Sequence, residues 1–278
     1  MPLDLHVHST ASDGTVAPRD IVRHAAHLGL GALAIADHDS VSGLDAALDE
    51  ADDAGITLVP AVELSASHEG RSIHVLGYFI EHTREAFLVE LTRLRAARLR
   101  RAERMVEALV EAGHDLELGD VLRLADGGAV GRSHVARALV DAGHADTVEE
   151  AFRRYVGRGK PFYVPKPATP PEDTVRLIRE AGGVAVLAHP GVTRVDDLIE
   201  MLAAAGLGGL EAFHGEHDAP TRERYARLAR DLGLVITGGS DYHGPGQGPG
   251  CALGAAGVPD WVLDELREAA GRRGDAKA

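Results

Sequence analysis

The sequence predicts an α/β fold in which strands alternate with helices, as in a (β/α) barrel, and into which a small all-helical domain is inserted. Short apolar runs alternate with helical segments in residues 1–84 and again in residues 167–278. Residues 85–166 show helical periodicity and no convincing strand. Polar side chains follow most of the predicted strands, which is typical of the active-site face of such barrels.

The N-terminal part is predicted to contain four strands and two helices. Pro18 near the start of the first helix and Gly29 after its end are typical helix boundaries. A short, continuous apolar run is typical of a buried parallel strand. The predicted strands cover residues 4–8, 32–36, 56–62 and 72–79, and the helices cover residues 18–28 and 43–54.

The helical insertion opens with a long helix that is dense in Arg, Glu and Leu, at residues 85–112. Glycines separate three shorter predicted helices, at residues 118–124, 133–142 and 147–156. Prolines at positions 161, 165, 167, 170 and 171 then predict a stiff linker. We therefore expect a barrel built from residues 1–84 and 167–278, with residues 85–166 as a separate helical domain.

Strict alternation returns after the linker. Three apolar runs predict strands, and each is followed by a polar residue at its end. The predicted strands cover residues 183–188, 209–213 and 234–238, and the helices cover residues 171–181, 196–205, 221–232 and 259–270.

The composition limits the class of protein. A formal net charge of −14 argues against broad nucleic-acid or membrane binding. The single cysteine, Cys251, rules out a disulfide framework and a paired-cysteine metal site. Neither a signal peptide nor an apolar run of membrane-spanning length is found. We expect a cytoplasmic protein that is a monomer or a small homo-oligomer.

Histidines and carboxylates recur near the ends of the predicted strands. His6 and His8 share one face of the first strand, and neutral imidazole is the commonest protein metal ligand. In a barrel, the carboxyl ends of the strands meet at one face. The candidate ligands are His6, His8, Asp13, His38, Glu63, His74, His189, Asp241 and His243. Nine nitrogen and oxygen ligands are too many for one ion and predict two or three.

Each candidate has a simpler interpretation when it is taken alone. His189 could be a core histidine, Asp241 a turn or helix cap, and Glu63 an exposed strand end. The metal interpretation is favoured because all of these simpler interpretations would have to hold together. His214 and His217 follow another predicted strand and are expected to border the same site.

Several motifs resemble, in order, those of the polymerase-and-histidinol-phosphatase (PHP) family. They are D-L-H-V-H-S-T-A-S-D-G, I-A-D-H-D, V-E-L-S, I-H-V-L-G-Y, A-H-P-G and G-S-D-Y-H, and they cover most of residues 1–83 and 170–257. The resemblance implies a distorted, TIM-like (β/α)7 barrel and usually three metal ions. It implies that one ion is held by His6, His8, Glu63 and Asp241, a second by Glu63, His74 and His189, and that a third lies near Asp13, His38 and His243.

The insertion resembles that of the branch containing nucleoside 3′,5′-bisphosphate phosphatases and a related 5′-to-3′ exoribonuclease. The matching segment, G-R-S-H-V-A-R at residues 131–137, opens a predicted helix. A helix start offers N–H groups to an anion, Arg132 can bind a phosphate bidentately, and Ser133 and His134 add donors. These three residues are therefore expected to bind the substrate. Without the resemblance, Ser133 would be read as a helix cap.

The implied reaction is hydrolysis of a phosphate ester by a metal-activated hydroxide that attacks phosphorus in line. Asp241 is expected to orient the nucleophile, and His189 or His214 to protonate the leaving oxygen. The expected substrate is a nucleoside 3′,5′-bisphosphate, such as adenosine 3′,5′-bisphosphate giving AMP, or the 5′-phosphorylated end of a short RNA. The expected cofactors are two to three divalent ions, foremost Mn²⁺, with Zn²⁺, Fe²⁺ or Mg²⁺ as alternatives.

Three other functions remain open at this point. A histidinol-phosphate phosphatase would have the same fold and metals with a different pocket. A metal-dependent amide or cyclic-phosphate hydrolase is possible on chemical grounds, because an ion cluster alone does not fix the electrophile. A non-catalytic metal-binding domain could dock a partner on its acidic surface, although the complete ligand set argues against it.

Overall fold

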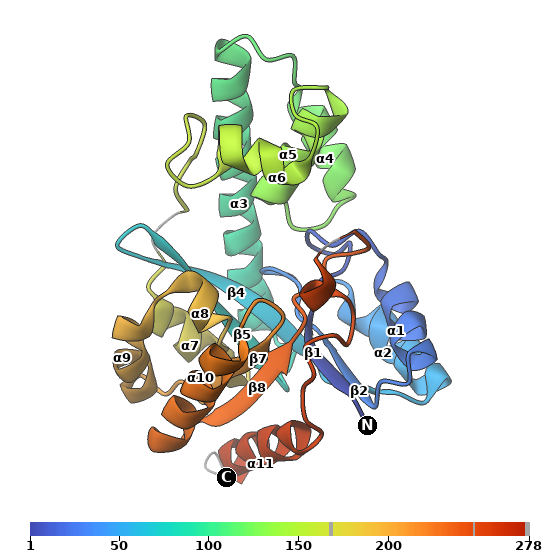
Figure 1. Ribbon diagram of the computed structural model, residues 1–278, viewed down its shortest axis with the longest axis vertical. Coiled ribbons are helices and arrows are strands. Elements are labelled where there is room, and N and C mark those ends of the chain that lie inside the picture. The colour runs from blue at the N-terminus through green and yellow to red at the C-terminus, as the bar shows by residue number, and fades with distance from the viewer. Residues whose placement is uncertain (167–168, 247, 276–278) are drawn as a thin grey trace.

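The computed structural model describes residues 1–166, 169–246 and 248–275. In these residues eight strands form two sheets (Figure 1). The first sheet is parallel and contains β1 (Leu3–Val7), β2 (Ala32–Ile35) and β3 (Thr57–Leu58). The second is mixed and contains β4 (Ala61–His68), β5 (Arg71–Tyr78), β6 (Val184–Leu187), β7 (Gly209–His214) and β8 (Val235–Gly239).

The expected α/β class is confirmed, but the sheets do not close into a hydrogen-bonded barrel. The two sheets meet at two seams, and each seam carries one isolated bridge among the described residues, Val7 with Tyr242 and His38 with Glu63. The backbones approach closely at the first seam, where a Cβ on Gly239 would lie 2.3 Å from the Cβ of His6. The strands therefore surround a common interior without a continuous ladder.

The strand predicted at residues 56–62 was wrong in its extent. Pro60 has no N–H to donate to a ladder, and it separates β3 in the first sheet from β4 in the second. β4 then continues to His68 and pairs antiparallel with β5. The connection is a two-residue turn in which Glu69 and Gly70 both have positive φ, as tight hairpins require. Glu63 consequently lies within a strand and not at the end of one.

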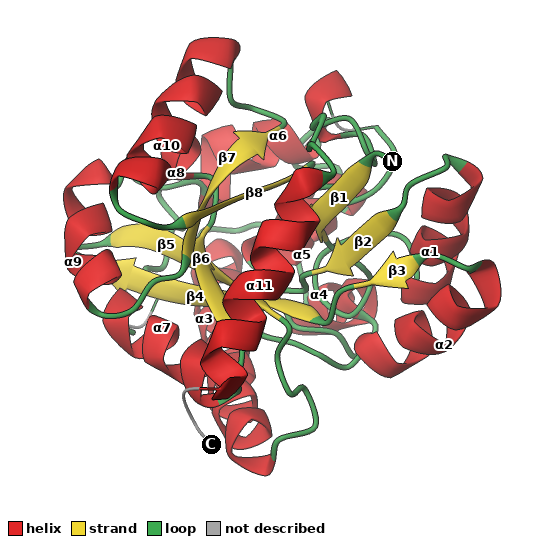
Figure 2. Ribbon diagram, turned by 90° about the horizontal axis from the view of Figure 1, so that it is seen from below, coloured by secondary structure: helices red, strands yellow, loops and turns green. Residues whose placement is uncertain are grey.

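Helices cover the outside of both sheets (Figure 2). Alternate strand residues, such as Leu33, Ile35 and Leu210, pack against these helices, while Leu5, Ala34 and Val186 face the interior. The helices of the outer layer are α1 (Pro18–His27), α2 (Leu44–Ala54), α7 (Pro171–Glu180), α8 (Pro190–Thr193), α9 (Ile199–Ala204) and α10 (Ala219–Asp231). A 3₁₀ turn, Asp196–Leu198, precedes α9.

One helix, α11 (Trp261–Asp275), lies across the end of the strands opposite the expected site (Figure 2). Val262 and Leu266 of this helix are completely buried and belong to the interior core that Leu5 and Val186 line. The interior is therefore filled and closed at this end.

The predicted helical insertion stands above the sheets (Figure 1). It contains α3 (Glu85–Glu111), α4 (Leu118–Ala125), α5 (Arg132–Asp141), α6 (Val148–Ala151) and a π-helical turn (Phe152–Val156). Residues from Ala102 to Val156 form a separate hydrophobic core, whereas Phe87, Leu91 and Leu94 of α3 pack into the core of the sheets. α3 is thus shared between the two parts, and we keep residues 85–166 as the proposed insertion. Of the linker prolines, Pro167 lies outside the described residues. None of the described helices has the length and apolar character of a membrane-spanning helix.

Candidate metal centre

The nine side chains predicted as metal ligands meet at one end of the strands. They come from β1 and the loop after it (His6, His8, Asp13), the loop after β2 (His38), β4 and β5 (Glu63, His74), and the turns after β6 and β8 (His189, Asp241, His243). All nine fall into four overlapping groups, in each of which the ligand atoms lie within 4.8 Å of one another. The structure therefore brings together residues that span almost the whole chain.

Left-handed backbone conformations occur where three parallel strands end. Asp39 after β2, His189 after β6 and Asp241 after β8 have φ values of 51°, 30° and 55°. Residues other than glycine rarely adopt this conformation, and such strain is typical of functional sites. All three residues lie within four positions of the end of their strand, where the chain leaves the sheet.

Glu63 is at the centre of the cluster, and it is only 1% exposed. Its Oε1 lies 2.9 Å from Nδ1 of His74 and 3.2 Å from Nε2 of His189. Its Oε2 lies 2.7 Å from Nδ1 of His38 and 3.4 Å from Nε2 of His8. Because the two oxygens face different imidazoles, each oxygen of this carboxylate would be able to bind a different ion.

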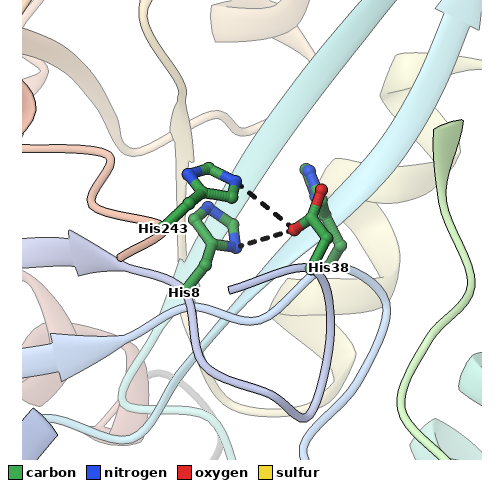
Figure 3. Close-up of side chains that lie close together, drawn as sticks. His8, His38 and His243 are labelled. Atoms are coloured by element: carbon green, nitrogen blue, oxygen red, sulfur yellow. Dashed lines mark ion pairs between the residues drawn. The ribbon is translucent and has the colours of Figure 1, made fainter. Parts of the chain in front are cut away.

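Asp13 forms the other side of the cluster with three histidines, His8, His38 and His243. Figure 3 shows these three imidazoles close together. The rings of His8 and His243 stack with their centroids 4.1 Å apart. Oδ1 of Asp13 lies 3.3 Å from Nε2 of His243 and 3.9 Å from Nδ1 of His8. His8 therefore faces Glu63 with one ring nitrogen and Asp13 with the other.

The arrangement of these atoms fits divalent ions. Among the described residues, four buried ligand atoms have no hydrogen-bond partner: Asp13 Oδ1, His38 Nδ1, Glu63 Oε2 and His74 Nδ1. Buried polar atoms without partners are costly and uncommon. Atoms that bind one ion at about 2.0–2.3 Å lie roughly 3–4 Å apart, close to most of the spacings found here. Divalent ions in the cluster would give these atoms their missing partners.

The charges of the cluster also favour a cation. Burial alone would raise the pKa of Glu63, but the neighbouring imidazoles hold it well below its usual value. Burial lowers the pKa of His8 to about 4, and His243 acts in the same direction. Burial opposes the charge on His243 too, yet Asp13 and Asp241 raise the pKa of this imidazole to about 10. Glu63 is therefore ionised and His8 neutral at pH 7, as metal binding requires.

Glu211 supports the cluster from behind and was not predicted from the sequence. This completely buried carboxylate lies 2.9 Å from Nδ1 of His6 and accepts the backbone N–H of His189 at 2.7 Å. Carboxylates that orient metal-binding histidines are common outside the ligand set. The available signal was a glutamate within the apolar run at residues 209–213.

His214 lies beside the cluster, as expected. Its Nδ1 accepts the backbone N–H of Glu216 at 3.1 Å, so the neutral ring carries its proton on Nε2. This Nε2 atom is 3.7 Å from Oδ2 of Asp241 and has no hydrogen-bond partner among the described residues. His214 is not a member of any of the four ligand groups.

Cations from the insertion lie directly against the ligand cluster. Nζ of Lys166 is 2.9 Å from Nε2 of His74. Burial and the guanidinium of Arg98 lower the pKa of Lys166 well below its usual range. Arg98 forms an ion pair with Asp39 and donates to Oγ of Ser65 at 2.6 Å. The insertion therefore reaches the proposed metal ligand His74 through the amine of Lys166, with the guanidinium of Arg98 nearby.

A small pocket between α3 and the start of α5 is lined by Arg98, Arg101 and Arg132. Arg101 is 5% exposed, and its Nη2 has no hydrogen-bond partner among the described residues. Burial and the nearby Arg132 lower the pKa of Arg101 to about 9. The Arg132 guanidinium lies over the rings of Phe152 and Tyr163, 5.4 Å from each centroid. The sequence analysis identified Arg132 as a phosphate contact, but it did not identify Arg98 or Arg101 of α3.

Two residues predicted to bind substrate have partners in the protein. The Ser133 hydroxyl donates to Oδ2 of Asp13 at 2.8 Å. His134 is 1% exposed, and its Nδ1 accepts the backbone N–H of Gly131 at 3.0 Å. Ser133 therefore faces the metal cluster, and His134 caps its own helix.

Comparison with known proteins agrees with these features. The PHP domain matches residues 4–160 of this chain. The 5′-3′ exoribonuclease Rnm of Salmonella typhimurium is 38% identical over 87% of this chain and 85% of its own. The 3′,5′-nucleoside bisphosphate phosphatase of Chromobacterium violaceum is 36% identical over 88% of each chain. A Bifidobacterium adolescentis structure described as a metal-dependent phosphoesterase aligns with a TM-score of 0.89, at 34% identity, over 97% of this chain and 98% of its own.

Proposed function

This chain belongs to the PHP domain family, and we propose that it is a metal-dependent phosphoesterase that removes the 3′-phosphate of nucleoside 3′,5′-bisphosphates. We include the 5′-phosphorylated end of a short RNA as a second substrate, because a relative at similar identity is named an exoribonuclease. The observation that carries the proposal is that the pocket lined by Arg98, Arg101 and Arg132, here called the cation pocket, lies beside the ligand cluster. Arg98 and Lys166 both donate to Oγ of Ser65, and Lys166 contacts His74.

The cation pocket accounts for a substrate with two phosphates. Arg101 and Arg132 are largely buried, and the pocket that they line with Arg98 contains no carboxylate among its described lining residues. A buried guanidinium with an unpaired N–H group is expected to bind an anion, and a phosphate matches its geometry. One phosphate would contact the guanidinium groups at the mouth of this small pocket while the other lies at the ligand cluster. Arg132 is the phosphate contact that we retain from the sequence analysis.

The residues of the cluster have separate proposed roles in hydrolysis. When bound, divalent ions supply Lewis acidity that activates water and neutralises charge on the phosphoryl group. Asp241 would orient the attacking water and accept its proton. The water oxygen bonds to phosphorus as the bond from phosphorus to the ribose oxygen breaks. His214 is our candidate to stabilise that oxygen, because its unpaired Nε2–H can donate a hydrogen bond to it whereas Nε2 of His189 faces Glu63. The leaving oxygen then takes its proton from solvent water. We propose Mn²⁺ as the working ion.

A substrate panel on the manganese-loaded protein tests the proposal. It contains adenosine 3′,5′-bisphosphate, a 5′-phosphorylated RNA oligomer, histidinol phosphate and a plain phosphate ester. We expect the bisphosphate to have the highest kcat/KM and to yield AMP. Preferential turnover of histidinol phosphate, or no phosphate release from any substrate, would contradict the proposal.

The Arg132→Ala variant tests the role of the cation pocket. Losing a charged hydrogen bond of roughly 1.5–3 kcal/mol should raise KM for the bisphosphate about 10- to 100-fold. The plain ester has no second phosphate, so its KM should stay the same. An equal rise in both KM values would remove Arg132 from phosphate recognition.

A further inference from the structure

The helical insertion also reaches the ligand cluster through Asp13, and this contact has a different chemical character from the cation pocket. We infer that Ser133 and Arg137 of α5 are positioning residues that complete the ion site formed by His8, Asp13, His38 and His243. This inference rests on the proposed metal-dependent function, and it assigns to the insertion a part in metal binding as well as in substrate choice.

Asp13 has no regular secondary structure to hold it. It lies in the loop between β1 and α1, which also reaches the insertion where the N–H of Ala129 donates to the carbonyl of Ala11 at 3.0 Å. Arg137 donates to the backbone carbonyl of Asp13, and Ser133 donates to Oδ2 of its side chain at 2.8 Å. The backbone and the carboxylate of Asp13 are therefore both fixed from α5.

The Ser133 hydroxyl leaves the other carboxylate oxygen available. Oδ1 of Asp13 faces His243 and His8, and it has no hydrogen-bond partner among the described residues. With Oδ2 engaged, the carboxylate cannot rotate without losing a charge-assisted hydrogen bond. The site thus presents one carboxylate oxygen and three imidazoles, a set that suits a divalent ion.

The spacing along α5 links this site to the cation pocket. Arg132, which lines the pocket, directly precedes Ser133, and Arg137 lies one helical turn after Ser133. Asp13 is the one predicted ligand that accepts a side-chain hydroxyl from the insertion in the described structure. The other three groups of ligand atoms do not contain Asp13, so a change at Ser133 should affect a single ion.

Metal binding gives a direct test that does not depend on turnover. The protein is stripped of metal, titrated with Mn²⁺, and its bound ions are counted by elemental analysis and by the electron paramagnetic resonance of free Mn²⁺. For Ser133→Ala we expect one ion to bind about 10- to 100-fold more weakly than in the wild type, the usual cost of losing an orienting partner. The other ions should bind normally. Ser133→Thr keeps the hydroxyl and should restore the wild-type titration.

Controls separate this inference from the proposed function. Arg132→Ala changes the neighbouring residue without touching Asp13 and should bind the same number of ions as the wild type. Arg137→Met removes the second contact to Asp13 and should weaken the same ion as Ser133→Ala. A Ser133→Ala protein that binds every ion like the wild type, or that loses all ions equally, would overturn the inference alone. A wild type that binds no divalent ion would overturn the proposed function as well.

Discussion

The two parts of the molecule contribute opposite chemistry to the same site. The helical insertion, residues 85–166, contains 14 Lys and Arg against 13 Asp and Glu, whereas the rest of the chain contains 15 against 30. All nine predicted metal ligands lie outside the insertion, and the cations beside them, Arg98, Arg101, Arg132 and Lys166, all lie within it. The strands and the loops after them therefore carry the proposed metal ligands, and the insertion carries the proposed anion contacts.

This difference suggests how one fold can serve several phosphate esters. The ligand cluster is built from strand ends and short loops, where packing on both faces fixes the side chains. The cation pocket is built largely from an inserted element, which can change without disturbing the strands. We therefore expect changes in the first region to abolish hydrolysis and changes in the second to alter the choice of substrate.

The largest effect is expected for Glu63→Gln. Removing the central negative charge should weaken metal binding and lower kcat by on the order of 10³-fold or more for every substrate. Phosphate release and bound metal would both be measured. Glu50→Gln is a matched control, because Glu50 of α2 is also buried but pairs with Arg23 of the neighbouring helix α1, in the outer helical layer. A Glu63→Gln enzyme with normal metal content and turnover would contradict the bridging role.

Arg101→Met should act on one class of substrate only. We expect about a 10- to 100-fold loss of kcat/KM for the bisphosphate and little change for a plain ester. The variant should also unfold at a higher temperature without ligand, since it removes a buried guanidinium with an unpaired N–H group. Arg100→Met, at the exposed neighbouring position of α3, serves as the control. Equal losses for both substrates would show that Arg101 acts in catalysis.

Glu211→Gln should have a smaller effect, which is a loss of metal affinity at the ligand cluster of the strand region. The amide can still accept one hydrogen bond but no longer orients His6 as an anion, so metal affinity should fall about tenfold. Isothermal titration with Mn²⁺ would measure this change, and the bisphosphate preference should be unaltered. A shift in substrate preference without a change in metal affinity would place Glu211 in substrate recognition instead.

The smallest expected effect is the release of protons when the ligand cluster binds Mn²⁺. Although burial opposes its charge, Asp13 and Asp241 raise the pKa of His243 to about 10, so the metal-free protein holds this proton at pH 7. The neutral ring is needed to bind a metal, and Mn²⁺ affinity should therefore rise as the pH increases from 7 toward 10. Titrations in two buffers of different ionisation enthalpy should show proton release. Uptake of protons, or identical heats in the two buffers, would contradict this assignment.

The pKa of His243 also predicts how the metal-free protein responds to pH. A folded-state pKa above the unfolded value of about 6.5 means that this group stabilises the fold fully below pH 6.5. The contribution should be lost as the pH rises through 10. Replacing His243 by Asn should flatten this part of the stability curve, as followed by thermal unfolding without metal.

Much of the strand region could be predicted because its signals are local. Each apolar run is short, and a ligand such as His6, His189 or Asp241 lies at or next to its end. The sequence did not reveal the hairpin that places Glu63 inside β4, because the run continues through Pro60 without a polar break. Glu211 was missed for a related reason, since its role depends on His6, which is 205 residues away.

The insertion was harder to interpret from the sequence. Arg98 and Arg101 are two of six arginines on α3, and nothing in their spacing distinguishes them from the exposed Arg93, Arg100 and Arg104. Only the packing of α3 against residues such as Val164 and Asp39 buries these two side chains. Ser133 was predicted to contact the substrate, and the sequence did not reveal that its hydroxyl contacts Asp13, a partner 120 residues away.

The most direct measurement is the selectivity of the Arg101→Met, Arg132→Ala double variant. Its kcat/KM would be determined for adenosine 3′,5′-bisphosphate and for a plain phosphate ester, with the bound Mn²⁺ counted in the same samples. If residues of the insertion determine the substrate preference and residues of the strand region carry out hydrolysis, kcat/KM for the bisphosphate should fall to that for the plain ester. The kcat/KM for the ester and the metal content should stay unchanged. A parallel fall in both values at full metal content would contradict this division of roles.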